Sequence, residues 1–152
     1  MIEKTPEFNQ DLYSSIAKII VDAKDQVYRN SNTILLKMYW ESGQLIIEDE
    51  QNGELRAKYG KSVLKNLANH LSVEFGKGFN DRNLNNMRAF FIAFPIWNAV
   101  RTELSWTHYR IISRIENSDH RIQYIEHSIE GNWNTRTLQR NIDSQYLLKF
   151  PE

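Results

Sequence analysis

The sequence predicts an all-α protein, a helical domain with long N-terminal helices and a helix-turn-helix-like core. Apolar residues recur at helical spacing through most of the chain. Only three prolines and six glycines interrupt the 152 residues, and no stretch alternates strongly enough to require a sheet. With 41% hydrophobic residues, a chain of this length can close one core. We therefore expect residues 1–152 to form a single domain.

Residues 6–50 are expected to form the long N-terminal helices. A cap, a first-turn proline and a first-turn acid in Thr5-Pro6-Glu7 open the first helix. Its apolar stripe consists of Leu12, Ile16, Ile19, Ile20, Ala23 and Val27. After a polar run at 29–32, a second stripe follows with Ile34, Leu35, Met38, Ser42, Leu45, Ile46 and Asp49. The pattern fits either an antiparallel hairpin or one long bent helix.

Residues 60–95 are expected to form the helix-turn-helix-like unit. Its first helix should bury Val63, Leu64, Leu67, Ala68 and Leu71. Gly76-Lys77-Gly78 then makes the turn, because two glycines can supply left-handed conformations. The second helix should bury Leu84, Met87, Phe91 and Phe94 and expose Arg82, Asn83, Asn85 and Asn86. An αα-corner whose asparagines only face solvent would show the same pattern.

Residues 104–146 are expected to form three short helices. A capping residue stands between two apolar residues at Leu104-Ser105 with Tyr109 and again at Trp133-Asn134 with Leu138. Phe79-Asn80 with Leu84 shows the same arrangement further upstream. This is the hydrophobic staple, so helices should begin at Asn80, Ser105 and Asn134. A further helix is expected over about 117–130.

Charge is distributed unevenly along a chain that is formally neutral. Residues 56–114 hold ten Lys and Arg against three Asp and Glu, which makes this block net +7. The flanking segments 1–55 and 115–152 are net −5 and −2. A basic block of this kind is typical of a segment with an anionic partner, most often nucleic acid, although a solvated basic face would show the same count.

The residues do not assemble an enzyme site that we can identify. Asp22-Ala23-Lys24, with Asp11 upstream, matches the short half of a PD-(D/E)XK metal site, but both lie on the first expected helix instead of a strand pair. His120 and His127 lie about 10 Å apart along one helix, too far to share a zinc ion. We expect no catalytic residue, no metal ligand and no cofactor.

The chain lacks the signals of export and of membrane insertion. It has no cysteine, its N-terminus shows no basic-then-apolar signal, and its longest apolar run, 89–97, contains Pro95. We therefore expect a cytoplasmic protein with no membrane partner.

A string of motifs resembles one bacterial family over residues 9–146. These motifs are Tyr39-Trp40-Glu41-Ser42-Gly43, Tyr59-Gly60-Lys61, Glu74-Phe75-Gly76-Lys77-Gly78-Phe79, Arg82-Asn83-Leu84, Met87-Arg88, Leu104-Ser105-Trp106-Thr107-His108-Tyr109-Arg110 and Gly131-Asn132-Trp133-Asn134-Thr135-Arg136-Thr137-Leu138. They look like the N-terminal domain of the YhcG-like nucleases. The resemblance implies a helical, DNA-binding N-terminal domain, which in full-length relatives precedes a C-terminal PD-(D/E)XK nuclease domain absent here. The chain departs from the family pattern at Asn132, where relatives have Gly directly before Trp.

Charge, the helix-turn-helix pattern and the resemblance together predict that the chain binds duplex DNA. Lys61, Lys65 and Lys77 are expected to contact phosphates. Arg82, Asn83 and Asn86 are expected to face base edges, since Arg pairs with guanine and Asn with adenine. Arg88 should brace the backbone, and the remaining expected contacts are His108, Arg110 and Arg114.

Two further partners follow from the N-terminal stripes. Their apolar length predicts a homodimer through the helices of 8–49. The alternative to DNA binding is a protein-interaction or oligomerisation module that docks a nuclease or another partner through its N-terminal helices. In that alternative, the basic middle block only complements an acidic partner surface.

Overall fold

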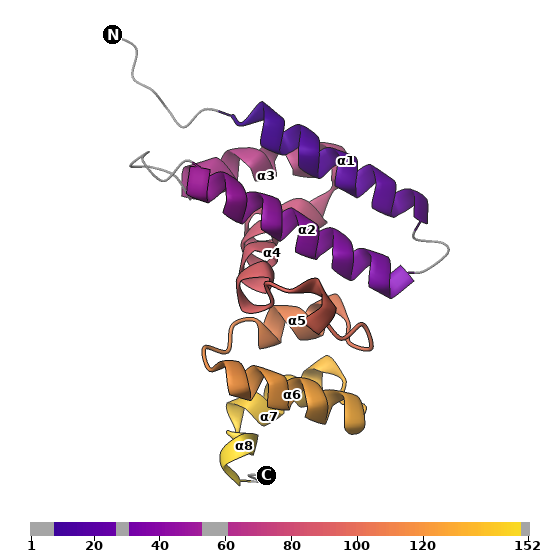
Figure 1. Ribbon diagram of the computed structural model, residues 1–152, viewed down its shortest axis with the longest axis vertical. Helices are drawn as coiled ribbons and strands as arrows, with labels where there is room; N and C mark the ends of the chain where they lie inside the picture. Colours follow the sequence, from indigo (N-terminus) through magenta and orange to yellow (C-terminus); the bar gives the residue numbers. More distant parts are fainter. Residues whose placement is uncertain (1–7, 27–30, 53–60, 150–152) are drawn as a thin grey trace. The chain divides into compact units, whose positions relative to one another are not determined.

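The computed structural model describes residues 8–26, 31–52 and 61–149, and in these ranges the regular elements are all helices (Figure 1). The all-α prediction is confirmed. The chain divides into two compact units, Met1–Ile92 and Ala93–Glu152. Each unit is described separately below, and the single functional domain expected from the sequence stays a prediction.

The first unit begins with two long helices, α1 (Gln10–Gln26) and α2 (Ser31–Asn52). They lie side by side and run in opposite directions (Figure 1), so the sequence alternative of a hairpin is confirmed over that of one bent helix. The predicted stripes supply most of the residues that they bury, namely Leu12, Ile16, Ile20, Ala23, Leu36, Met38, Trp40, Ser42 and Ile46. Because these residues are buried within the unit, α1 and α2 have less apolar surface left for a second copy. The dimer predicted through these helices stays a prediction.

Asn9 caps the start of α1, four residues after the expected cap. Its side-chain oxygen accepts a hydrogen bond from the amide of Leu12 at 2.9 Å, and its side-chain amide donates to Asp49 at 2.6 Å. Phe8 and Tyr13 flank the cap with their ring centroids 5.4 Å apart, which is the staple seen elsewhere in the chain. The expected start at Thr5-Pro6-Glu7 lies outside the described residues.

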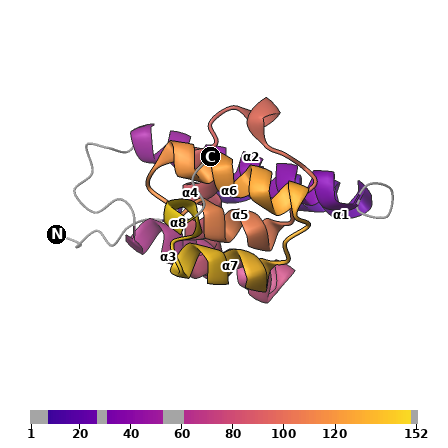
Figure 2. The same cartoon turned by 90° about the horizontal axis from the view of Figure 1, so that it is seen from below.

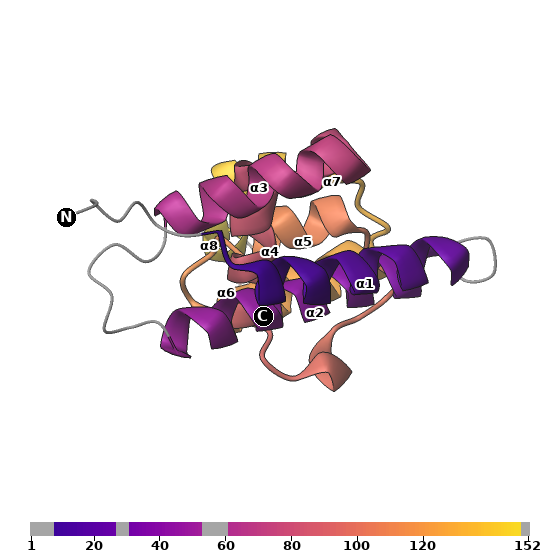
Figure 3. The same ribbon diagram turned by 90° about the horizontal axis from the view of Figure 1, so that it is seen from above.

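The first unit continues with α3 (Lys61–Phe75), the 3₁₀ helix η1 (Lys77–Phe79) and α4 (Asp81–Ala93). α1 also contacts α3, and Figure 3 shows these two helices running alongside each other. All five apolar residues predicted for the buried face of α3 are buried. α3 is thus fixed by its apolar stripe, which leaves the opposite face to solvent.

The second unit contains η2 (Trp97–Ala99), α5 (Trp106–Ile112), α6 (Ser118–Glu130), α7 (Thr135–Asp143) and α8 (Tyr146–Lys149). α5 lies between α6 and α7, as Figure 2 shows, and it contacts both helices. Tyr109 and Ile112 of α5 and Leu138 of α7 are completely buried. The core of this unit therefore lies around α5.

Local caps place the helix starts of the second unit as the sequence predicts. Ser105 accepts from the amide of His108, Asn117 from that of His120, and Asn134 from that of Thr137. Each cap satisfies an amide that the first turn of a helix cannot bond internally. At the end of α6, Asn132 takes a left-handed conformation with φ 50, which asparagine tolerates better than most residues. The departure from the family pattern is thus a turn residue.

Tyr109 joins the start of the second unit to its core. Its hydroxyl donates to the carbonyl of Arg101 at 2.8 Å and accepts from the amide of the same residue at 2.7 Å. Burial raises the pKa of Tyr109 well above its usual range. The hydroxyl therefore stays protonated and serves as both donor and acceptor.

Among the helices of the described ranges, none is both long enough and apolar enough to span a membrane.

Candidate nucleic-acid interface

The exposed face of α3 carries the first of the candidate contacts. Lys65 lies opposite the buried stripe and is exposed. Lys61 is the first residue of α3, and its side chain lies outside the described part of the structure. Val73, on the exposed side of the same helix, is 89% exposed. The solvent face of α3 is therefore mixed, with one described lysine and one large aliphatic residue.

The connection from α3 to α4 depends on Gly76. This residue has φ 96, a left-handed conformation that glycine adopts without strain, and its amide closes α3 by bonding Ser72 at 2.9 Å. Gly78 is not left-handed, so the expectation that both glycines supply this conformation is wrong for Gly78. Lys77 is exposed on the connection between the two helices.

Asn80 fixes the start of α4 as predicted. Its side-chain oxygen accepts from the amide of Asn83 at 2.8 Å, and its carbonyl accepts from that of Leu84 at 3.0 Å. Arg82, in the first turn, is exposed. A guanidinium group at this position lies near the positively polarised end of the helix, where phosphates and base edges are bound in many complexes.

The buried face of α4 is wider than the sequence indicates. Asn86, expected at the surface, is only 7% exposed. Its expected exposure is wrong, whereas its contact with base edges stays a prediction. On the side of Met87 and Phe91, α2 approaches α4 closely at Gly43. A Cβ at Gly43 would lie 2.1 Å from the carbonyl oxygen of Met87, so only glycine allows this approach. Trp40 also packs edge-on against Phe91 at 5.1 Å.

Two other predicted contacts are engaged within the first unit. The side-chain amide of Asn83 donates to the carbonyl of Gly78 at 2.6 Å, which turns it back onto the connection between the helices. Arg88 binds Glu50 with two nitrogens, Nε and Nη2, the latter at 2.7 Å from Oε1. Arg88 therefore braces α4 against α2, and its expected role on a DNA backbone stays a prediction.

A hollow of about 460 Å³ lies between α3 and the start of α4. Ser62, Leu64, Lys65, Asp81 and Asn85 line it. Asn85 is exposed and bonds the carbonyl of Asp81 at 3.1 Å. The lining of this hollow therefore carries one basic residue, Lys65, and one acidic residue, Asp81.

In the second unit, His108 has a structural role. Its Nδ1 accepts from the amide of Ser105 at 3.2 Å, and its Nε2 lies 2.8 Å from the carbonyl oxygen of Trp133. Both ring nitrogens are used in joining α5 to the start of α7. The predicted contact of His108 with a phosphate stays a prediction. Arg110 and Arg114 are exposed on and just after α5.

The aspartates of the rejected metal-site pattern lie on a helix. Asp11 and Asp22 are exposed on α1, where Asp22 pairs with Lys18 at 3.2 Å. Among the described residues, no group of three or more His, Cys, Asp or Glu side chains could hold a metal ion.

Comparison with known proteins identifies relatives. The family model described as DUF1016 N-terminal domain matches residues 15–149. A curated relative, "Putative nuclease YhcG" of Escherichia coli (strain K12), is 27% identical over 177 aligned residues. The match covers 95% of this chain and 47% of that protein, so the chain spans about half the length of the relative. No solved structure matches the chain.

Proposed function

The chain belongs to the DUF1016 N-terminal domain family, and we propose on this basis that it is the DNA-binding N-terminal domain of a nuclease-family protein. The relative is named a nuclease, and the chain aligns with about half of its length. In this proposal a separate C-terminal nuclease domain cleaves the DNA, and the present chain binds the duplex.

The observation that carries the proposal is the exposure of Lys65, Lys77 and Arg82. They belong to α3, to the connection and to the first turn of α4, three successive elements of one helical corner. Lys65 and Lys77 contact phosphates in this proposal, whereas Arg82 at the start of α4 reaches base edges. Lys61, Arg110 and Arg114 add phosphate contacts. For Asn83, Asn86, Arg88 and His108, contact with DNA stays a prediction.

The ion pair of Glu50 is relevant to the alternative function, in which the chain is a protein-interaction module that acts through its N-terminal helices. That alternative needs the acidic helices to meet a partner, and Glu50 of α2 already meets Arg88 of α4 within the same unit. Asp49 accepts a hydrogen bond from the neutral side chain of Asn9. One acidic charge of α2 is thus already paired within the unit, which weighs against this alternative.

The proposal is tested by single substitutions and fluorescence anisotropy with a labelled duplex. Arg82→Ala should weaken binding by about 1–3 kcal/mol with no change in thermal stability, because the side chain is exposed. Lys65→Ala should weaken binding less, and equally for different duplex sequences. Arg140→Ala removes an exposed arginine of α7 and serves as the matched control. Equal effects of Arg82→Ala and Arg140→Ala would refute the assignment of α4 to the interface.

A further inference from the structure

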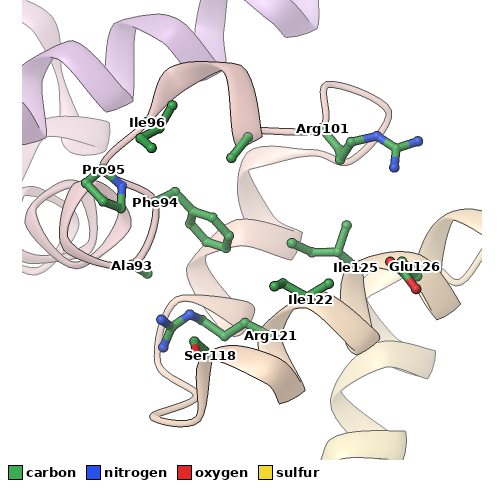
Figure 4. A pocket seen from close by; sticks show the side chains of 11 residues that line it. Ala93, Phe94, Pro95, Ile96, Arg101, Ser118, Arg121, Ile122, Ile125 and Glu126 are labelled. Atoms are coloured by element: carbon green, nitrogen blue, oxygen red, sulfur yellow. The ribbon is translucent and has the colours of Figure 1, made fainter. Parts of the chain in front are cut away.

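The second unit carries an apolar pocket that DNA binding does not use. Its volume is about 290 Å³, and one wall is the segment of Pro95, Ile96 and Ala99, which includes η2. The other wall is α6, which contributes Ser118, Arg121, Ile122, Ile125 and Glu126. Figure 4 shows the side chains of Phe94, Ile122 and Ile125 between the two walls. All of these residues belong to the second unit.

The floor of the pocket is rigid, whereas its rim is apolar and open. Phe94 is 6% exposed and packs edge-on against Tyr109 with ring centroids 5.3 Å apart. Tyr109 is itself held by two hydrogen bonds to Arg101. On the rim, Ile96 is 65% exposed and Ile122 is 52% exposed. Exposed aliphatic residues around a preformed pocket mark surfaces that bind other molecules.

Arg121 gives the pocket a fixed positive charge at one end. Its Nη1 donates to the carbonyls of Ile115 at 2.6 Å and Glu116 at 3.1 Å, and its guanidinium carbon lies 6.0 Å from the centroid of the Phe94 ring. The Nε and Nη2 groups of Arg121 have no hydrogen-bond partner among the described residues. An anchored guanidinium group with remaining donors is suited to a carboxylate, which it can bind with two parallel hydrogen bonds.

The opposite end of the pocket has a different charge. Arg101 is paired there with Glu103 at 2.7 Å, and Glu126 lies on the same side of the pocket in Figure 4. The net charge at that end is negative, because Glu103 and Glu126 outnumber Arg101. At the other end, the charge of Arg121 is positive. An occupant with a carboxylate is therefore oriented, with its acid at Arg121 and its apolar group over Phe94.

We propose that this pocket binds a peptide segment of a partner protein in which a large apolar side chain stands beside a carboxylate. The apolar side chain fills the space over Phe94, and the carboxylate binds Arg121. The rim favours a peptide over a small molecule, because Ile96 and Ile122 stay in water unless the occupant extends beyond the pocket. Of α3 and α4, the pocket uses Ala93 at the end of α4, and its lining contains none of the proposed DNA contacts.

The test uses short peptides, acetylated and amidated at their ends, with a Phe-Leu pair next to one aspartate. Binding is followed by amide chemical shifts of isotope-labelled protein. The aspartate peptide should shift α6 resonances, and the asparagine version should bind at least about tenfold more weakly, because it loses the charge-assisted pair. Absence of binding, or shifts confined to other helices, would overturn the proposal.

Variants separate the pocket from the fold. Ile122→Ser should reduce binding several-fold without altering the melting temperature, because this side chain is half exposed. Leu148→Ser is the matched control, since Leu148 is an exposed apolar residue of α8 outside the pocket and should leave binding unchanged. Arg121→Gln should abolish the preference for aspartate over asparagine. Arg121→Lys should restore part of it. A preference that survives in Arg121→Gln would overturn the role of Arg121.

A small apolar acid distinguishes a peptide site from a metabolite site. 4-Phenylbutyrate should bind more weakly than the aspartate peptide, and Ile96→Ser should weaken the peptide alone. Equal affinity for both probes, with no effect of Ile96→Ser, would overturn the peptide proposal in favour of a small-molecule site. Duplex DNA binding should be the same in Ile122→Ser and in the unmodified chain, so failure here is distinguishable from failure of the DNA proposal.

Discussion

The two units of the chain differ in how far their side-chain hydrogen bonds reach along the sequence. In the first unit, Asn9 bonds Asp49, Tyr13 bonds Glu74 and Arg88 bonds Glu50, so the partners are 40, 61 and 38 residues apart. In the second unit, the caps join residues three apart, and Tyr109 bonds Arg101, eight residues away. His108, with Trp133 at a separation of 25, is the longer link there.

This difference explains which structural features can be predicted from the sequence. A cap with its staple fits within six residues, so it is visible as a pattern before any fold is known. A pair such as Glu50 and Arg88 becomes visible only when two helices are placed side by side. The first unit carries most of the proposed interface. Which of its charged side chains stay exposed is therefore harder to predict from the sequence than the caps of the second unit.

The largest expected effect comes from the core of the first unit. Leu84→Ala should cost about 2–4 kcal/mol of unfolding free energy, because Leu84 is completely buried and the substitution leaves a cavity. Urea denaturation measures this loss. Val73→Ala is the control on the exposed face of α3 and should change stability by less than about 0.5 kcal/mol. A smaller loss for Leu84→Ala than for Val73→Ala would show that α4 faces the other way.

A second prediction compares hydroxyl groups in the two units. Tyr109→Phe should cost about 1–3 kcal/mol, because it leaves the partly buried amide and carbonyl of Arg101 without the hydroxyl that both bond. Tyr13→Phe removes a hydroxyl that bonds Glu74 at the surface and should cost less than about 1 kcal/mol. Denaturation of both variants in the same buffer gives the comparison. Similar losses would mean that Tyr109 does not hold the second unit together.

The same tyrosine sets a pH dependence. Burial raises the pKa of Tyr109 above the ordinary value of 10.0, so the folded state holds this proton more tightly than the unfolded state. Its contribution to stability is complete below pH 10 and is lost as pH rises above 10, at up to about 1.4 kcal/mol per pH unit. The pKa of Tyr13, which hydrogen-bonds Glu74, and that of Tyr124 are also raised. Tyr109→Phe should therefore reduce the alkaline slope without abolishing it.

A third, smaller effect separates a cap with a distant bond from a cap alone. Asn9→Ala removes the cap of α1 together with the bond to Asp49, whereas Asn134→Ala removes only the cap of α7. We expect a loss of about 1–2 kcal/mol for Asn9→Ala and about 1 kcal/mol for Asn134→Ala. Thermal melts of the two variants decide. The reverse order would show that the bond between Asn9 and Asp49 adds no stability.

The fold was largely predictable from local patterns. Periodicity gave the helices and the buried face of α3, and staples gave the starts at Asn80, Ser105 and Asn134. The staple at Phe8, Asn9 and Tyr13 carries the same signal, and it competes in the sequence with the start signal at Thr5-Pro6-Glu7. The hairpin was one of two open alternatives, because nothing local distinguishes a turn from a bend.

The candidate site was less predictable, for a physical reason. Asn86 and Arg88 are polar residues in an exposed-looking pattern, but Asn86 is buried and Arg88 pairs with Glu50 of α2. The sequence indicates a packed or phosphate-contacting His108 near a helix start, and in the structure both of its nitrogens serve the fold. No sequence pattern marks Arg121, because its anchoring on the carbonyls of 115 and 116 appears only in three dimensions.

The most direct test of the central claim is a titration of the chain with duplex DNA at two salt concentrations. The account predicts measurable binding at low salt and an affinity that falls steeply as salt rises. The log–log slope should be about −3 to −5, because some four to six phosphates are neutralised by the exposed lysines and arginines. Absence of binding at low salt, or an affinity independent of salt, would contradict the claim that this chain binds DNA.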